Sequence, residues 1–264
     1  MNRLRGAFDQ AVAENRAALV CYLTFADPDP ATSIEVVEAA CRAGADVIEL
    51  GVPFSDPSAD GPSIQRAMER ALEAGGSLPG ALDAVRTLRE RGNTTPIVMF
   101  GYYNPIFVMG PDAFAQRAAA AGVDAVLTVD LPIDELAELA TPLAAKGIAV
   151  IPLVAPTSTT DRIDRLAHFA PPFVYYISLV GVTGVQAAVP VDPARLAMIR
   201  KAASAPVAVG FGIRTPADAH LFALAADGVV VGTALVDRVA AGPASGAAAR
   251  VGELVAQLAA AMKR

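Results

Sequence analysis

The chain has few of the side chains on which the commoner kinds of enzyme chemistry depend. Its 264 residues include only two histidines, His168 and His220, and three lysines. Both histidines fall in predicted helical stretches, so a histidine-ligated metal site is not expected. Lys146, Lys201 and Lys263 lie in helical stretches or at the terminus rather than at strand ends, which disfavours a Schiff-base aldolase.

Cysteine and long apolar runs are scarce as well. Cys21 and Cys41 have no CxxC spacing and cannot build a disulfide framework, which suits a reducing compartment. The first sixteen residues, MNRLRGAFDQAVAENR, lack the apolar core of a signal peptide. The apolar runs are strand-sized, well short of the ~20 residues of a membrane span. We therefore expect a cytoplasmic protein that does not bind membranes.

The charge balance is acidic, with 21 Lys and Arg against 27 Asp and Glu. A general nucleic-acid surface is therefore not expected. Hydrophobic residues make up 54% of the chain and charged residues 18%, which excludes a disordered protein. No linker or change of composition divides the sequence, so residues 1–264 are predicted to form a single domain.

Short β-branched runs alternate with amphipathic helical stretches along the whole chain. In one such stretch, residues 81–91, an apolar stripe runs through Leu82, Val85 and Leu88. Three segments (AGADVIELG, AGVDAVLTVD and AADGVVVGT) share one pattern, a helix end followed by a buried strand. The expected strands are residues 19–24, 46–51, 96–101, 124–129, 147–154, 173–178, 206–210 and 228–232.

Eight such units, about 33 residues each, predict an α/β fold, a (β/α)8 TIM barrel. An extra helix at residues 2–15 would precede the first strand. A doubly wound open sheet is the alternative that the pattern leaves open.

The second expected strand carries a carboxylate, Glu49. Strand alternation places Val47 and Glu49 on one face and Ile48 and Leu50 on the other. If the latter pair packs against helices, Glu49 points into the barrel mouth, where burial raises the pKa of its carboxyl group. Such a group can act as general acid and base at neutral pH. A structural ion pair with an arginine is the alternative.

The loop after this strand, GVPFSDPSADGP at residues 51–62, contains three prolines and two acids, Asp56 and Asp60. Asp and Pro are common in plain turns. A loop stiff enough to hold a second carboxylate near Glu49 would also fit a site with paired carboxylates.

Glycines follow three successive expected strands: GVTG at 181–184, GFGI at 210–213 and Gly232-Thr233. The loops after strands seven and eight form the usual phosphate site of this fold. Each glycine pair alone fits a tight turn, but the three together favour a phosphate monoester. No GxGxxG motif follows the first strand, so dinucleotide binding is disfavoured.

These motifs resemble the tryptophan synthase α subunit family. The resemblance is carried by ELGVPFSDPSADGP at 49–62 and extends to YLTFADPD at 22–29, residues 102–104, Asp130-Leu-Pro132, GVTG, GFGI and Gly232-Thr233. It spans nearly the whole chain in the family's order.

The resemblance implies retro-aldol cleavage of indole-3-glycerol phosphate to indole and glyceraldehyde 3-phosphate. Glu49 would be the general acid and base, and Asp60 would accept a hydrogen bond from the indole N–H. Tyr175 would lie beside Glu49, and Thr183 would orient its loop against Asp60.

The resemblance also implies the residues that bind each part of the substrate. Those matching phosphate-binding positions are Gly184, Gly212, Gly232 and Thr233. Those matching the indole pocket, which are otherwise simply core residues, are Tyr22, Phe100, Leu127, Ile151, Leu153 and Phe211.

A partner is implied too: a β subunit that carries pyridoxal phosphate and forms an α2β2 tetramer, this chain having no cofactor or metal. The residues expected to meet it are Pro53, Asp56, Asn104 and Pro132. A free-standing lyase, a degenerate barrel that only activates a partner, and a sugar-phosphate isomerase remain as alternatives.

Overall fold

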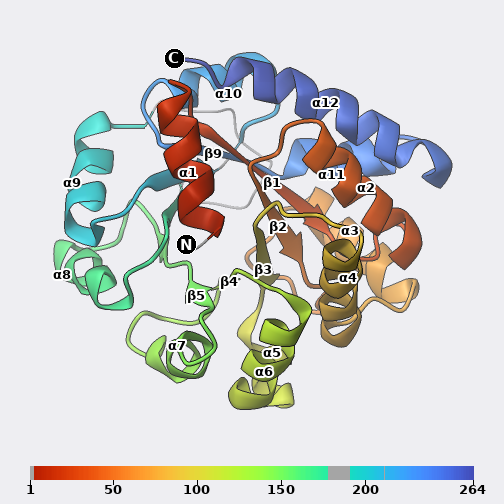
Figure 1. The fold of residues 1–264 in the computed structure, drawn as a ribbon, viewed down its shortest axis with the longest axis horizontal. Coiled ribbons are helices and arrows are strands. Elements are labelled where there is room, and N and C mark those ends of the chain that lie inside the picture. Colours follow the sequence, from red (N-terminus) through yellow and green to blue (C-terminus); the bar gives the residue numbers. More distant parts are fainter. Residues whose placement is uncertain (1–2, 178–190, 211) are drawn as a thin grey trace.

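The computed structural model describes residues 3–177, 191–210 and 212–264. Within them, nine strand segments form one parallel sheet in the order β5-β4-β3-β2-β1-β9-β8-β7-β6, surrounded by helices (Figure 1). The strands are β1 (Ala18–Thr24), β2 (Val47–Gly51), β3 (Ile97–Gly101), β4 (Ala125–Thr128), β5 (Ala149–Val150), β6 (Leu153–Val154), β7 (Val174–Ile177), β8 (Val207–Gly210) and β9 (Gly228–Val231).

The sheet closes into a barrel through residues 149–154. This stretch, expected to be one strand, is two short ones that together occupy one position in the barrel. β5 pairs with β4 on one side, and β6 pairs with β7 on the other. Between them Pro152 has no N–H to donate, which interrupts the ladder, while its carbonyl oxygen accepts from Tyr175 N at 3.0 Å. The (β/α)8 barrel, and not an open sheet, is therefore the fold.

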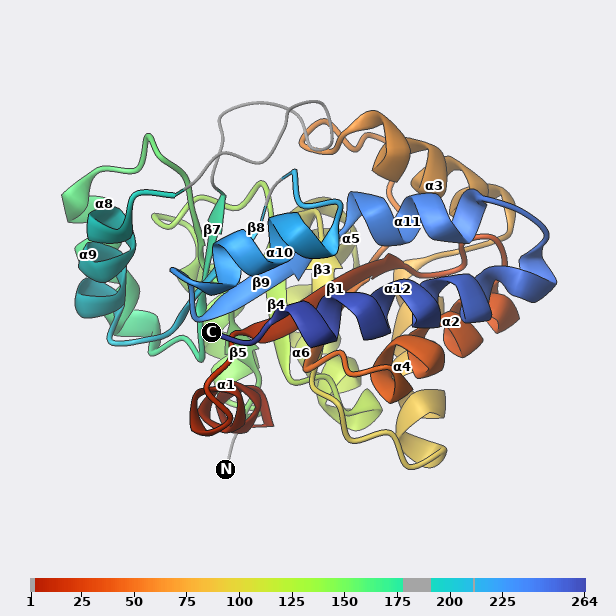
Figure 2. The ribbon, with the colours of Figure 1, turned by 90° about the horizontal axis from the view of Figure 1, so that it is seen from above.

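The helices lie outside the barrel, with the exception of α1 (Arg3–Ala13), which lies across one end of the strands (Figure 2). The others are α2 (Pro30–Arg42), α3 (Pro62–Glu73), α4 (Leu78–Glu90), α5 (Tyr103–Met109), α6 (Pro111–Ala121), α7 (Ala137–Ala144), α8 (Thr160–Asp164), α9 (Pro193–Ala203), α10 (Pro216–Ala223), α11 (Thr233–Ala240) and α12 (Ala247–Ala261), with 3-10 turns η1 (Arg165–Phe169) and η2 (Ala244–Gly246). Within the described residues, no helix is long and apolar enough to cross a membrane.

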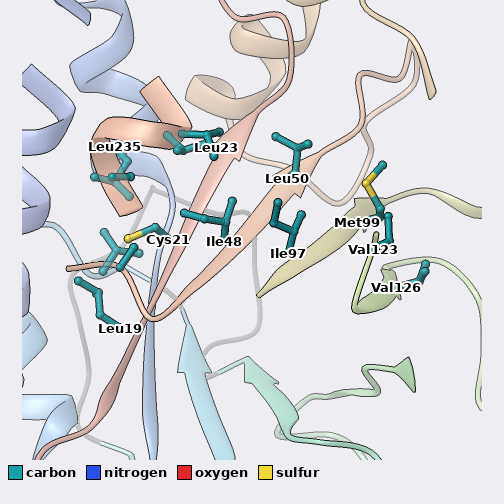
Figure 3. Close-up of a cluster of buried hydrophobic side chains, with 14 of the residues drawn as sticks. Leu19, Cys21, Leu23, Ile48, Leu50, Ile97, Met99, Val123, Val126 and Leu235 are labelled. Atoms are coloured by element: carbon teal, nitrogen blue, oxygen red, sulfur yellow. The ribbon is translucent and has the colours of Figure 1, made fainter. Parts of the chain in front are cut away.

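Strand alternation divides the buried side chains into two layers. The outer layer lies between the strands and the helices, and Figure 3 shows a part of it, including Cys21, Ile48 and Met99. The inner layer fills the barrel with residues such as Val20 and Val98. Because both faces of each strand are buried, the strands are almost continuously apolar.

Helix α1 is the extra N-terminal element, and it covers the end at which the strands begin. Leu4, Phe8 and Ala11 are its buried residues. The Phe8 ring stacks on that of Phe173, with centroids 5.1 Å apart. Helix α1 therefore closes this end of the barrel, opposite the end where the strands finish.

Three strands, β2, β4 and β9, begin directly after an aspartate. They are the strands of the three segments that share a sequence pattern. Each carboxylate accepts a backbone N–H from the neighbouring strand, which fixes the register of the pair. The bonds run from Leu19 N to Asp46 (2.8 Å), from Ile97 N to Asp124 (2.8 Å) and from Val207 N to Asp227 (2.9 Å).

An arginine neutralises each of these aspartates, and Asp124 is the most enclosed of them. Arg89 donates to Asp124 Oδ2 at 2.7 Å and also to the backbone carbonyls of Asn93 and Thr95. Arg3, whose side chain is half exposed, donates to Asp124 Oδ1 at 2.8 Å. The two other pairs are Arg16 with Asp46 and Arg200 with Asp227.

Candidate active site

A cavity lies at the end where the strands finish, and it contains both predicted carboxylates. It also contains three of the glycine-loop residues expected to bind phosphate. The lining residues are Tyr22, Glu49, Asp60, Ile64, Phe100, Tyr175, Gly212, Ile213, Val230, Gly232 and Thr233.

Glu49 is fully buried on β2, and its side chain lies on the inner face, as the alternation predicts. Its strand neighbours in register are Tyr22 of β1 and Val98 of β3. Among the described residues neither carboxylate oxygen has a hydrogen-bond partner. Burial therefore raises the pKa of Glu49 to about 8, and the predicted alternative, an ion pair with an arginine, does not occur within the described part of the chain.

Asp60 is 4% exposed and lies in the loop between β2 and α3. Burial raises the pKa of its carboxyl group to about 6, because the charged form loses its hydration. The Tyr102 hydroxyl donates to Asp60 Oδ2 at 2.8 Å and partly opposes this rise. The two carboxyl groups thus share one cavity but have different affinities for a proton.

The position of Asp60 is fixed by the helix that begins two residues later. Gln65 of α3 donates to the Asp60 carbonyl oxygen at 2.8 Å. Further along α3, Arg70 makes two hydrogen bonds of 2.8 Å to the buried carboxylate of Asp27, in the loop after β1. Helix α3 is therefore held against β1, and Asp60 with it.

Tyr175 lies on β7 and faces the same cavity. The pKa of its hydroxyl is raised by burial first and by the nearby Glu49 and Asp60 charges second. Its ring fits only because position 210 is glycine: a Cβ there would overlap the Tyr175 hydroxyl and lie 2.7 Å from Cζ.

Substituting Gly210→Ala is expected to displace Tyr175. Overpacking of this kind costs about 1–3 kcal/mol of stability, and a shift of about 1 Å in a site can cost about 100-fold in rate. We expect urea unfolding and kcat/KM to report both losses. The matched control is Gly6→Ala, where a new Cβ meets nothing within 4 Å. Normal activity in the Gly210 variant would contradict this role for the glycine.

Residues of the glycine loops line the cavity. Gly232 is the N-cap of α11 and has no side chain that could cap the helix, and Thr233 is the first helical residue. Gly212 has a φ of +70°, in the left-handed region that glycine adopts without strain. The positive end of the α11 dipole favours an anion there.

The residues predicted to form the indole pocket lie in two different parts of the barrel mouth. Tyr22 and Phe100 line the cavity, with their rings 5.1 Å apart, edge to face. Leu127 is buried in the inner layer beside them. Ile151 and Leu153 instead line a larger cavity, about 290 Å³ against about 60 Å³, at the ends of β4 and β6. Among the described residues that line the larger cavity, Asp130 is the one carboxylate and none is a glycine. The smaller cavity contains both predicted carboxylates and two glycines, so it is the candidate site.

Sequence reasoning missed Ile64, Ile213 and Val230, which complete the wall. Val230 follows the inward alternation of β9, and Ile64 lies in the first turn of α3, four residues after Asp60, so both could have been predicted. Tyr102, the hydrogen-bond partner of Asp60, was also missed. Thr183, Gly184 and Phe211, which were predicted to take part, lie outside the described residues.

The predicted partner-binding residues follow β2, β3 and β4, whose ends are neighbours at the barrel mouth. Asp56, Asn104 and Pro132 are exposed there. Pro53 is buried, and its ring lies where a Cβ on Gly76 would meet it. Pro53 can therefore shape the β2–α3 loop but does not offer a surface of its own.

The remaining chemistry-bearing residues are away from the cavity. Lys201 lies in α9, while Lys146 lies in the turn before β5 rather than in a helix. The described residues contain no group of His, Cys, Asp and Glu that could hold a metal ion. Fold and cavity together define a class: a barrel enzyme that performs acid–base chemistry with carboxylates on a small anionic substrate.

Comparison with known proteins identifies the family. The sequence pattern of the family described as Tryptophan synthase alpha chain matches residues 8–263. The Tryptophan synthase alpha chain of Burkholderia thailandensis is 48% identical over 263 residues, covering 99% of this chain and 97% of that one. That of Caulobacter sp. strain K31 is 49% identical, covering 91% and 88%. The chain belongs to the tryptophan synthase alpha chain family.

Solved structures agree with this assignment. A structure of Mycobacterium tuberculosis tryptophan synthase superposes with a TM-score of 0.91 at 38% identity, covering 100% of this chain and 99% of that one. The tryptophan synthase alpha chain from Legionella pneumophila gives 0.90 at 35% identity, covering 99% and 97%.

Proposed function

We propose that this chain cleaves indole-3-glycerol phosphate to indole and glyceraldehyde 3-phosphate in tryptophan biosynthesis, with Glu49 as general acid and base and Asp60 as its electrostatic partner. Family membership supports the reaction. The observation that carries the residue assignment is the fully buried Glu49 carboxyl, which faces the same cavity as a second carboxylate and the N-terminus of α11.

The different pKa values of the two carboxyl groups set the order of the steps. Near neutral pH Glu49 is protonated and Asp60 is ionised. Glu49 gives its proton to C3 of the indole ring, and the positive charge that develops on the ring N–H is stabilised by the Asp60 carboxylate.

The Glu49 carboxylate formed in this step then accepts the proton of the hydroxyl on the carbon bonded to C3. The C–C bond breaks, its electron pair returns to the indole ring, and the hydroxyl carbon becomes the aldehyde. Glu49 ends protonated again, so one residue serves as acid and base and no net proton is consumed.

The phosphate group would bind at the glycine loops. Gly212, Gly232 and Thr233 line the cavity, and the α11 dipole favours a dianion there. Gly184 would add a further amide. Tyr22 and Phe100 would hold the indole ring, so that the substrate extends from the carboxylates to the helix.

This chemistry requires no cofactor in this chain, and pyridoxal phosphate belongs to the β subunit. We also propose that the chain docks that subunit in an α2β2 tetramer, in the cytoplasm. Asp56, Asn104 and Pro132 would lie in the interface because all three are exposed at the barrel mouth.

The decisive experiment measures indole release from indole-3-glycerol phosphate, with and without a cognate β subunit. A large rise in rate with the β subunit supports the α-subunit assignment. Equally fast release without it would make this chain a free-standing lyase instead. No release under either condition would overturn the proposed reaction.

The rate should depend on pH through both carboxyl groups. Asp60 must be ionised, so activity is lost as the pH falls through about 6; Glu49 must be protonated, so activity is lost as the pH rises through about 8. We expect a bell-shaped profile of kcat/KM with its maximum between these values. A rate that keeps rising above pH 9 would contradict the role of Glu49 as the acid.

A further inference from the structure

The Tyr102 side chain is hydrogen-bonded to Asp60, yet the proposed reaction gives Tyr102 no role. Its hydroxyl donates to Asp60 Oδ2 at 2.8 Å and accepts the backbone N–H of Ala59 at 2.9 Å. Donor and acceptor are thus both engaged, which fixes the direction of the O–H bond. The hydroxyl proton points at the carboxylate.

The ring of Tyr102 is held as firmly as its hydroxyl. It is 4% exposed and stacks on Phe54, with centroids 4.9 Å apart and planes 27° apart. Phe54 and Ala59 both belong to the loop that carries Asp60. Tyr102 therefore contacts three groups of this loop: the Phe54 ring, the Ala59 backbone N–H and the Asp60 carboxylate.

We infer that Tyr102 is a positioning residue that orients Asp60 and connects it to the loops at the mouth of the barrel. The inference rests on the proposed function, because it concerns how Asp60 is made ready for the indole N–H. It assigns to Tyr102 no contact with the substrate.

The connection to the mouth runs through the next residue. Tyr102 is the N-cap of α5, and the backbone N–H of Tyr103 donates to Asp130 Oδ1 at 2.8 Å in the loop after β4. The loops after β2, β3 and β4 are thereby joined by hydrogen bonds at residues 102 and 103. A β subunit that binds at Asn104, Asp56 or Pro132 would move these hydrogen-bonded loops, and the Asp60 carboxylate with them.

The electrostatic effect of Tyr102 has a definite sign. Within the part of the chain that the structure describes, the other titratable groups that face Asp60 are Tyr22 from β1, Glu49 from β2 and Tyr175 from β7. Residues 178–190 contain no titratable side chain. Each of these neighbours is neutral or acidic, and burial also favours the protonated carboxyl group. The Tyr102 hydrogen bond favours the ionised form, so its loss must raise the pKa of Asp60.

The test compares Tyr102→Phe with Tyr103→Phe. Each change removes one tyrosine hydroxyl that donates to a carboxylate at 2.8 Å, but Tyr103 bonds Glu138 on the surface. Because Asp60 loses a hydrogen bond to its charged form, we expect Tyr102→Phe to lower kcat/KM by about 10–100-fold, mainly in kcat. Without the β subunit, Tyr103→Phe should match the wild type.

A second measurement separates orientation from packing. The Asp60 carboxyl is titrated by carbon-13 NMR in the free protein, its signal being assigned with Asp60→Asn. We expect its titration midpoint to move to higher pH in Tyr102→Phe and to stay in place in Tyr103→Phe. Activation by the β subunit should also be weaker in Tyr102→Phe than in the wild type.

An unchanged Asp60 midpoint in Tyr102→Phe would overturn the inference, as would wild-type kcat/KM in that variant. The NMR titration needs no substrate. If the wild type failed to cleave indole-3-glycerol phosphate, the proposed function would fail, whereas a shifted midpoint would still support the placement of Asp60 by Tyr102.

Discussion

Replacing Glu49 with glutamine is expected to reduce indole release to the limit of detection. General acid–base catalysis by one side chain contributes about 100–10,000-fold, and here the same carboxyl group serves in both proton transfers. Glutamine keeps the shape of the side chain but cannot transfer the proton. We expect kcat to fall by at least this factor, as measured by indole release in a single turnover.

Binding should survive the same change. Because Glu49 makes no hydrogen bond with the described residues, Glu49→Gln breaks no contact seen in the fold. The affinity for a substrate analogue without the glycerol hydroxyls should therefore stay within a few-fold of the wild type. Glu73→Gln, an exposed change at the end of α3, is the matched control. Cleavage at the wild-type rate by Glu49→Gln would show that another group moves the proton.

Replacing Asp124 with alanine is expected to cause the largest loss of stability. The Asp124 and Arg89 side chains are only 6% and 13% exposed, and the change leaves the arginine without its carboxylate. Breaking a buried ion pair from one side costs about 3–5 kcal/mol. The Ile97 N–H at the start of β3 also loses its acceptor. Urea unfolding followed by circular dichroism measures the change.

Arg3→Ala is the control for this prediction. Arg3 bonds the same carboxylate, but its side chain is 49% exposed, and surface ion pairs contribute about 0–1 kcal/mol. The Arg3 variant should therefore unfold close to the wild type. Equal losses in the two variants would mean that burial does not determine the strength of this network.

The barrel could be predicted from the sequence because its strands are buried on both faces. Apolar β-branched runs bounded by Gly, Pro or Asp define their own limits, and seven of the eight strands begin within one residue of the predicted position. The exception is the stretch around Pro152. There the sequence shows an apolar run, but only the closed barrel shows that each half pairs with a different neighbour.

The site was predictable to the extent that strand register determines it. Glu49 faces inward because Val47 does, and the glycine loops follow strands whose ends must meet. The Tyr102–Asp60 hydrogen bond joins residues 42 positions apart and depends on the angle at which α5 leaves β3. The burial of Pro53 similarly depends on how its loop folds against Gly76. Side-chain patterns do not encode such long-range contacts.

The proposed chemistry depends on Glu49 being a neutral carboxylic acid at the pH at which the protein works. Infrared difference spectroscopy between the wild type and Glu49→Gln tests it directly, through the carbonyl stretch of a protonated carboxyl group. We predict that this band is present at pH 7 and disappears as the pH rises through about 8. A carboxylate band at pH 7, with protonation only near the ordinary value of 4.5, would contradict the role of Glu49 as the acid.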